Sequence, residues 1–245
     1  MSLTDMVIMP GSHYQAICDA VRAKTGGTAV LKSGELAAAI AGIAGGGASS
    51  EDALIARTLT SYTNTTAEEI GGYAFYFYKS LVSVDFPNVK KFTGSNNFQA
   101  CEGLETINFP KLEFAGGGNA FRGCISLKRA VLPRLKNPGI SFDGCTSLEF
   151  VDMGEEVAVD ELSSIPYIGN FKNDSALVTL VLRYQKKVSL NGVDKFSGTP
   201  IASGDGYIYV PSALIDDYRS GTNWVTFSQQ FRAIEDYPEI TGGAV

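Results

Sequence analysis

The chain of 245 residues contains one histidine, His13. A catalytic triad, a histidine metal site and a histidine general base would all depend on this residue. His13 stands at the start of an expected surface helix, with no acidic partner close to it in sequence. We therefore expect His13 to be solvent-exposed, and we expect no enzyme active site, no metal site and no cofactor.

Clustered basic residues are also scarce. The 20 basic residues are outnumbered by 26 acidic ones, giving a net charge of −6. Binding to nucleic acid needs Lys and Arg gathered on one face. The nearest approach to such a group, Arg183 with Lys186 and Lys187, is explained at least as well by a solvated strand end. We expect no nucleic-acid partner.

No apolar run approaches the ~20 residues that a membrane-spanning helix needs, so we expect no membrane insertion. The first segment, Met1 to Pro10, lacks the charged-then-apolar layout of a signal peptide. If the protein reaches an exterior surface, we expect it to do so without a signal of its own. Export within a larger particle released by lysis would satisfy that condition.

What the chain does contain is a repeated apolar pattern, F-x-x-C-x-x-L-x-x-I-x-F-P, which starts at Phe98. Further copies start at Phe75, Phe121 and Phe142, and a weaker one starts at Phe171. Spacings of three suit a short helical or 3₁₀ turn, and the alternating I-x-F suits a strand that proline ends. One unit cannot bury its apolar edge alone, so stacked units must share a core. The sequence predicts an α+β repeat solenoid of about five turns.

The repeat accounts for the positions of three of the four cysteines. Of the four, Cys101, Cys124 and Cys145 occupy one equivalent position in successive copies, and Cys18 lies outside the array. Equivalent positions stack along a solenoid core, where a free cysteine behaves as a small buried hydrophobe. We predict buried thiols rather than disulfides or metal ligands.

The step from Phe142 to Phe171 is longer than the steps between the earlier copies. It contains Glu155, Glu156, Asp160 and Glu161. This acidic excursion is either a functional loop or an ordinary solvated insertion.

The regions that flank the repeats differ from them. Residues 1–44 predict a helical hairpin, because Ser12 to Gln15 fits a capping box and apolar residues line one face of each helix. Those faces carry Tyr14, Ile17, Val21, Leu36 and Ile40, which we interpret as attachment residues. Residues 45–52 are a Gly/Ser linker by composition, or alternatively a loop inside one domain. Residues 53–245 form the solenoid.

Caps are expected at both ends of the solenoid. Ala53 to Thr63 predicts a first strand. At the other end, Tyr207 to Pro211 predicts a strand, and Ser212 caps a following helix. Trp224, Phe227 and Phe231 then continue an apolar helical face, which gives a strand-helix cap.

These motifs resemble a known family. The repeat pattern looks like the surface-antigen (BspA-like) type of leucine-rich repeat, over roughly residues 53–237. The first segment, I-C-D-A-V-R-A-K-T-G from Ile17 followed by L-A-A-A-I from Leu36, resembles a short module of phage and prophage tail-region proteins. The first resemblance implies a leucine-rich-repeat-like fold with many possible ligands. The second implies a protein carried on a virion.

Binding residues are expected on the outward face of the predicted sheet. The candidates are Ser83, Asp85, Thr106, Asn108, Arg129, Phe150 and Asp152. A mixed face with Arg129 and Phe150 at its centre would suit a glycan or a protein loop; an ordinary solvated sheet is the alternative. The run Tyr73 to Tyr78 places Tyr76 and Phe77 on a turn, where exposed aromatic rings suggest an interface or packing on the first strand.

Three functional hypotheses follow. The first is a non-enzymatic phage structural protein of the tail or baseplate region, located on the virion, which binds host-surface glycan or protein, or other virion proteins, through its repeats. The second is a bacterial cell-surface leucine-rich-repeat adhesin, and the third is a glycan-acting enzyme. A homo-oligomer is possible, although no heptad run supports a coiled coil.

Overall fold

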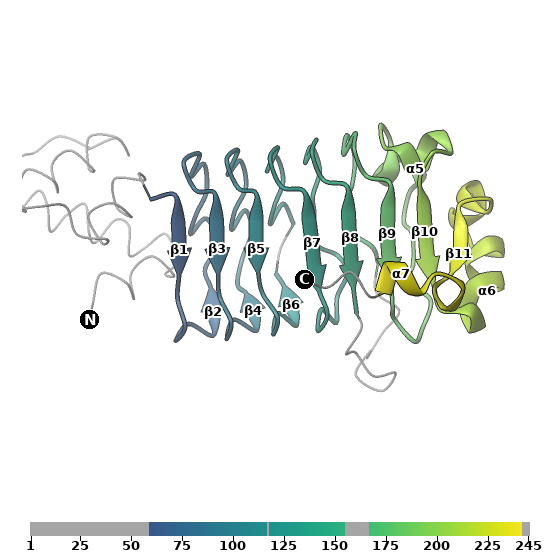
Figure 1. Cartoon of the computed structure of the whole chain (residues 1–245), viewed down its shortest axis with the longest axis horizontal. Helices are drawn as coiled ribbons and strands as arrows, with labels where there is room; N and C mark the ends of the chain where they lie inside the picture. Colours follow the sequence, from purple (N-terminus) through teal and green to yellow (C-terminus); the bar gives the residue numbers. More distant parts are fainter. Residues whose placement is uncertain (1–58, 117, 155–166, 242–245) are drawn as a thin grey trace, which may run out of the picture.

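A computed structural model describes residues 59–116, 118–154 and 167–241. These residues form an elongated solenoid whose parallel strands lie side by side in chain order (Figure 1). The predicted hairpin, its linker and the acidic excursion lie outside the described residues. So do these individually predicted residues: His13, Tyr14, Ile17, Cys18, Val21, Leu36 and Ile40.

Two parallel sheets form the front of the solenoid. The first contains β1 (Ser61–Thr63), β3 (Ser83–Asp85) and β5 (Thr106–Asn108). The second contains β7 (Arg129–Leu132), β8 (Phe150–Met153), β9 (Thr179–Leu182), β10 (Tyr207–Val210) and β11 (Phe231–Ala233). β5 and β7 are neighbours at the break between the two sheets. Each repeat contributes one short strand to these front sheets, as the alternating pattern predicts.

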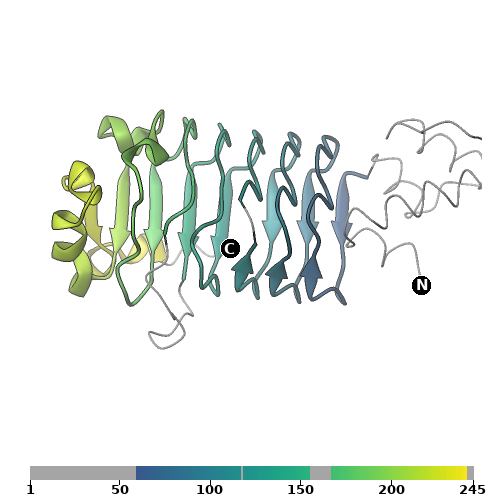
Figure 2. The same cartoon turned by 180° about the vertical axis from the view of Figure 1, so that it is seen from behind.

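A third sheet, which the sequence analysis did not predict, runs along the amino-terminal half. It contains β2 (Glu69–Ile70), β4 (Lys91–Phe92) and β6 (Phe114–Ala115), and Figure 2 shows it in front. Val89 and Leu112, two residues after the prolines, are buried and lead the chain into this sheet. Each of its strands has two residues, which is too short for an alternating pattern to reveal in the sequence.

The core is continuous, and its most regular feature is a stack of phenylalanine rings. Neighbouring rings are 4.9–5.7 Å apart between centroids and 4–17° from parallel. The stack consists of Phe75, Phe98, Phe121, Phe142, Phe171 and Phe196. Phe196 is a copy that the sequence analysis missed, because the residues after it lack the Cys and Leu of the pattern. The ring stack therefore has six members, one more than the five repeat copies predicted from the sequence.

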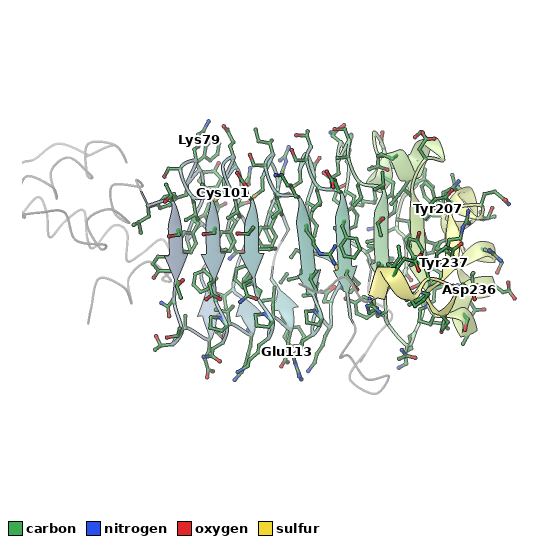
Figure 3. The ribbon with its side chains drawn as sticks, viewed as in Figure 1. Lys79, Cys101, Glu113, Tyr207, Asp236 and Tyr237 are labelled. Carbon is green, nitrogen blue, oxygen red and sulfur yellow. The ribbon has the colours of Figure 1, made fainter. Side chains whose placement is uncertain are left out.

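Between the Phe and Leu positions, each copy makes a pair of tight turns. The Cys101 N–H donates to the Phe98 carbonyl at 3.2 Å, and the Leu104 N–H donates to the Cys101 carbonyl at 3.0 Å. Residues three apart therefore point the same way, as predicted. We call the line of these turns the turn edge; Lys79, labelled in Figure 3, lies on it.

The prediction of buried thiols is confirmed for the three cysteines in the array. All three are free and buried. Each thiol donates to the carbonyl of the preceding copy's phenylalanine; for Cys101 the Sγ–O distance to Phe75 is 2.9 Å. Burial, together with the neighbouring thiols, raises the pKa of the Cys124 thiol well above its usual value.

After β9 the chain forms short helices around two further strands. They are η2 (Val193–Phe196), α5 (Pro200–Ser203), η3 (Ser212–Leu214), α6 (Ile215–Ser220), η4 (Trp224–Phe227), η5 (Ile234–Asp236) and α7 (Pro238–Thr241). Trp224 and Phe227 are buried against Phe196, where the ring stack ends.

The expectation that Phe231 continues a helical face is wrong. Phe231 opens β11 and pairs in parallel with Ile208 of β10. Its spacing from Trp224 and Phe227 suits a helix, but the open edge of β10 offers backbone hydrogen bonds that a strand satisfies. The ring still enters the core, where it packs on Tyr218 and Trp224.

Candidate binding face

The outward side chains of the front strands form two rows along the solenoid. Strand pairing aligns the first row as Ser61, Ser83, Thr106, then Arg129, Phe150, Thr179 and Tyr207. The second row runs Thr63, Asp85, Asn108, then Val131, Asp152, Val181 and Tyr209. The inward positions between the rows belong to the core. All seven residues predicted for a binding face therefore lie on outward positions.

In the amino-terminal half, this face is polar. The side chains at both rows are small, carrying hydroxyl, amide or carboxylate groups. Asn108 Nδ2 donates to Asp85 Oδ1 at 2.7 Å, which links β3 and β5 across the face. Thr106 is exposed beside them. This half therefore offers hydrogen-bonding groups but no large side chain along its two rows.

In the carboxy-terminal half, an arginine covers an aromatic ring. The guanidinium carbon of Arg129 on β7 lies 3.6 Å from the centroid of the Phe150 ring on β8. A cation over a ring face is attracted by the quadrupole of the ring. The predicted central pair is therefore in contact, and Phe150 is half-buried beneath the guanidinium.

Asp152 differs from the prediction, because its carboxylate is already engaged. Arg183 approaches it with two hydrogen bonds, Nε to Oδ1 at 2.8 Å and Nη2 to Oδ2 at 2.7 Å. Asp152 is 6 % exposed. A planar, two-point pair of this kind fixes both side chains. Asp152 therefore organises the face and neutralises Arg183, and its carboxylate is not open to a ligand.

The carboxy-terminal tail folds over part of the face. α7 lies in front of the lower ends of β9 and β10 (Figure 1), and Tyr237 packs edge-on against Tyr209 with ring centroids 5.3 Å apart. Val181 is 0 % and Tyr209 6 % exposed as a result. Burial, with Tyr237 nearby, raises the pKa of Tyr209. The second row is thus covered at its carboxy-terminal end.

The first row stays open there and carries residues that the sequence analysis did not single out. Tyr207 is 38 % exposed, and the guanidinium carbon of Arg232 on β11 lies 4.2 Å from the centroid of its ring. Figure 3 labels Tyr207 and Tyr237 at this end of the solenoid. The alternation Y-I-Y in β10 signalled outward tyrosines. Arg232 had no such signal, because its strand was not predicted.

The turn edge carries a separate aromatic cluster, Tyr73, Tyr76 and Phe77. Tyr73 is 57 % and Phe77 45 % exposed, as expected for rings on a turn. Their rings pack edge-on in sequence, at 5.3 Å and 4.5 Å between centroids. Both Tyr73 and Phe77 have a positive φ, 62° and 57°. Side chains with a Cβ rarely adopt this conformation.

The described part of the chain offers little for catalysis. Within it, no group of three or more His, Cys, Asp or Glu side chains is placed to hold a metal ion. The most perturbed carboxyl, Asp174, is buried, and burial raises its pKa to about 10. Asp174 stands at the position of the three cysteines, and Oδ1 accepts the Cys145 N–H at 2.8 Å. It is a neutral core group rather than an acid facing a cleft.

The family comparison agrees with this architecture. Residues 56–164 match the family model described as BspA type leucine rich repeat region, in six copies. Residues 56–164 therefore contain a BspA-type leucine-rich repeat region, which confirms the resemblance over that part of the predicted span 53–237. A comparison with curated proteins found no match.

Two solved structures are similar to the chain. One is a leucine rich cell surface protein from Faecalibacterium prausnitzii, 19 % identical with a TM-score of 0.40; the match covers 64 % of this chain and 56 % of that one. The other is the T. pallidum leucine rich repeat protein, 22 % identical with a TM-score of 0.34, covering 62 % and 58 %. The chain thus spans less than two thirds of either structure.

The comparisons do not support the resemblance of the first segment to a phage tail-region module. As for membranes, no helix in residues 59–116, 118–154 or 167–241 is long and apolar enough to cross a bilayer.

Proposed function

We propose that the chain is a non-enzymatic binding protein of a bacterial cell surface and that it recognises its partner through the outward sheet face. Support for the location comes from the repeat type, since the matched region is of the surface-antigen kind. This is the second of the hypotheses drawn from the sequence. The virion hypothesis depends on the first segment alone.

The outward face carries the binding part of the proposal. Two uncovered stretches of the first row, around Thr106 and around Thr179, lie on rigid parallel strands. Binding surfaces built on regular elements need little ordering on association, because their side chains are already held in place. Arg129, held on the Phe150 ring, is of a residue type enriched in binding hot spots.

The location is tested by fractionating the bacterium that produces the chain and labelling intact cells with a membrane-impermeant reagent. We expect the chain in the envelope fraction, accessible from outside. Recovery with purified phage particles, and its absence from particle-free envelopes, would overturn the cell-surface location in favour of the virion.

The binding face is tested with two matched substitutions of exposed threonines. Thr106→Trp places a bulky ring on the sheet face, and Thr146→Trp places the same ring on the turn edge. Both full-length variants are tested for binding to cells from the producer's habitat. We expect the first to weaken binding about tenfold or more and the second to leave it unchanged. Equal binding by both would show that the sheet face is not used.

A further inference from the structure

The loop that leads into η2 carries an asparagine followed by a glycine, Asn191-Gly192. No other asparagine of the sequence precedes a glycine. The backbone nitrogen of the residue after an asparagine can attack the side-chain carbon Cγ, and glycine hinders this attack least because it has no Cβ. Both reacting groups belong to one chain, so no second molecule has to be brought to them.

The fold leaves both reacting groups free. The side chain of Asn191 is exposed to solvent. Within the part of the chain that the structure describes, its amide group makes no hydrogen bond, and neither does the N–H of Gly192. The side chain is therefore free to turn its Cγ toward the backbone nitrogen, and no hydrogen bond has to break before the two atoms meet.

Most of the other asparagines in the described residues are held by side-chain hydrogen bonds. Asn108 is also exposed, but it donates to Asp85 at 2.7 Å and precedes a phenylalanine. Asn223 donates to the Leu190 carbonyl at 2.7 Å. The others with such bonds are Asn64, Asn88, Asn97, Asn137 and Asn170. Asn191 thus combines exposure, a free side chain and a glycine neighbour.

We propose that Asn191 is a site of spontaneous self-modification, at which the folded chain converts the asparagine into aspartate and isoaspartate with water as the only co-reactant. The Gly192 nitrogen forms a bond to Asn191 Cγ. The bond from Cγ to the side-chain nitrogen breaks, and that nitrogen leaves as ammonia with the proton of the Gly192 N–H. Water then opens the cyclic imide at either of its carbonyls, which leaves one new carboxylate, and no atom changes its oxidation state.

The two products differ in their effect on the fold. Aspartate adds a charge to a side chain that is already exposed. Isoaspartate routes the main chain through the former side chain and so lengthens it between two anchored carbonyls. The Leu190 carbonyl accepts from Asn223, and the Gly192 carbonyl accepts from the Lys195 N–H at 3.3 Å. Because Phe196 follows Lys195 directly, we expect isoaspartate to disturb the last ring of the stack.

The test follows individual asparagines by peptide mass spectrometry while the full-length chain is stored at mildly alkaline pH, folded in one arm and unfolded in urea in the other. Chromatography separates the aspartate and isoaspartate peptides. We expect conversion at Asn191 in the folded chain, slower than in the unfolded chain by less than about tenfold, because the fold holds neither reacting group. Asn108 is the internal control and should stay an amide in the folded chain.

Two substitutions supply matched controls. Gly192→Ala places a Cβ beside the attacking nitrogen and should slow the conversion about tenfold or more. This variant should fold, because φ is 173° at Gly192 and the added Cβ would meet only the end of the Asp194 side chain. Asn191→Asp carries the charge of the product without the longer main chain. It should keep the thermal midpoint of the parent, whereas the isoaspartate fraction should unfold at a lower temperature.

The proposal is overturned if Asn191 stays an amide in the folded chain while it converts in the unfolded one, since the fold would then protect it. Conversion at the same rate in Gly192→Ala and in the parent would also overturn it, because the glycine neighbour would then play no part. An isoaspartate fraction with the thermal midpoint of Asn191→Asp would refute the expected effect on the ring stack.

Discussion

From β1 to β5, the outward positions carry only hydroxyl, amide and carboxylate groups, whereas from β7 to β11 they also include arginine and aromatic rings. The interior does not change in the same way, because the ring stack runs through both halves with similar spacing. The repeat therefore constrains the inside and leaves the outside free to differ. A binding site is to be sought where the outside departs from small polar residues.

The halves also differ on the turn edge. One position of each turn has a positive φ, and in the later copies it is occupied by Gly123, Gly144, Asn173 and Gly198. In the first two copies it is held by Phe77 and Ala100. Glycine takes this conformation without steric cost and asparagine takes it more readily than other side chains, so the early turns, with Phe77 and Ala100, carry more strain than the later ones.

The largest effect is expected from breaking the interior that the halves share. Phe121 stacks between Phe98 and Phe142, at 5.3 and 5.5 Å. Phe121→Ala should lower the free energy of unfolding by about 3–5 kcal/mol, because it leaves a cavity in a packed core. Urea unfolding measures the loss. The exposed Phe114 serves as the control, and Phe114→Ala should cost far less.

A smaller loss of stability is expected from a substitution in the second half, at a position that departs from the repeat pattern. Gly154 stands at the position of the repeat proline, has φ +84°, and a Cβ there would lie 2.7 Å from the Tyr184 ring. Gly154→Pro restores the pattern but should destabilise the chain by about 3 kcal/mol, since proline requires φ near −65°. Thermal unfolding that is unchanged by this substitution would contradict the structure.

The third prediction concerns pH and Asp174. The pKa of its carboxyl is raised by burial to about 10, from 3.8. Between these values the folded chain keeps a proton that the unfolded chain releases, so stability falls as pH rises, by at most about 1.4 kcal/mol per unit. Below about pH 4 both states hold the proton and this loss is absent.

Asp174→Asn keeps an acceptor for the Cys145 N–H but does not titrate. The variant should therefore be more stable than the parent at pH 8, and the difference should shrink toward pH 4. Urea unfolding at both values measures it. Asp205→Asn, on an exposed residue, is the matched control. A difference that does not vary with pH would show that Asp174 is ionised in the core.

The smallest change in stability is expected from substitutions on the turn edge. Ala100→Gly should stabilise the chain by about 1 kcal/mol, because it relieves the cost of a positive φ. Phe77→Gly relieves the same cost but also loses the edge-on contact with Tyr76, so its gain should be smaller. The thermal midpoints of the two variants test which substitution gains more stability. A lower midpoint for Ala100→Gly than for the parent would show that Ala100 is not strained.

The interior could be predicted from the sequence because stacking repeats the same environment at every copy. The equivalence of Cys101, Cys124 and Cys145 implied a shared buried position, which their thiol-to-carbonyl hydrogen bonds bear out. The sequence analysis missed the copy at Phe196, because this copy keeps the phenylalanine and lacks the rest of the pattern. Only its spacing from Phe171, similar to that between the other copies, pointed to it.

The face was less predictable, because alternation says which way a side chain points and nothing about what covers it. Val181 occupies an outward position of β9 and is nevertheless buried, since the tail with Tyr237 lies over that end of the sheet. The Asp152 carboxylate accepts two hydrogen bonds from Arg183, which lies on the segment after β9. Both contacts arise between neighbouring elements of the fold, and no local pattern reports them.

The ring stack has a consequence for how such a chain can change length. The step from Phe142 to Phe171 contains more residues than the step from Phe121 to Phe142. The ring centroids are nevertheless 5.7 Å apart across the long step and 5.5 Å apart across the short one. The ring spacing is therefore kept although the two steps differ in their number of residues. Duplicating the unit between Phe98 and Phe121 would thus lengthen the array by one ring spacing. Single units can therefore be added to the array during evolution while both ends of the solenoid keep their structure.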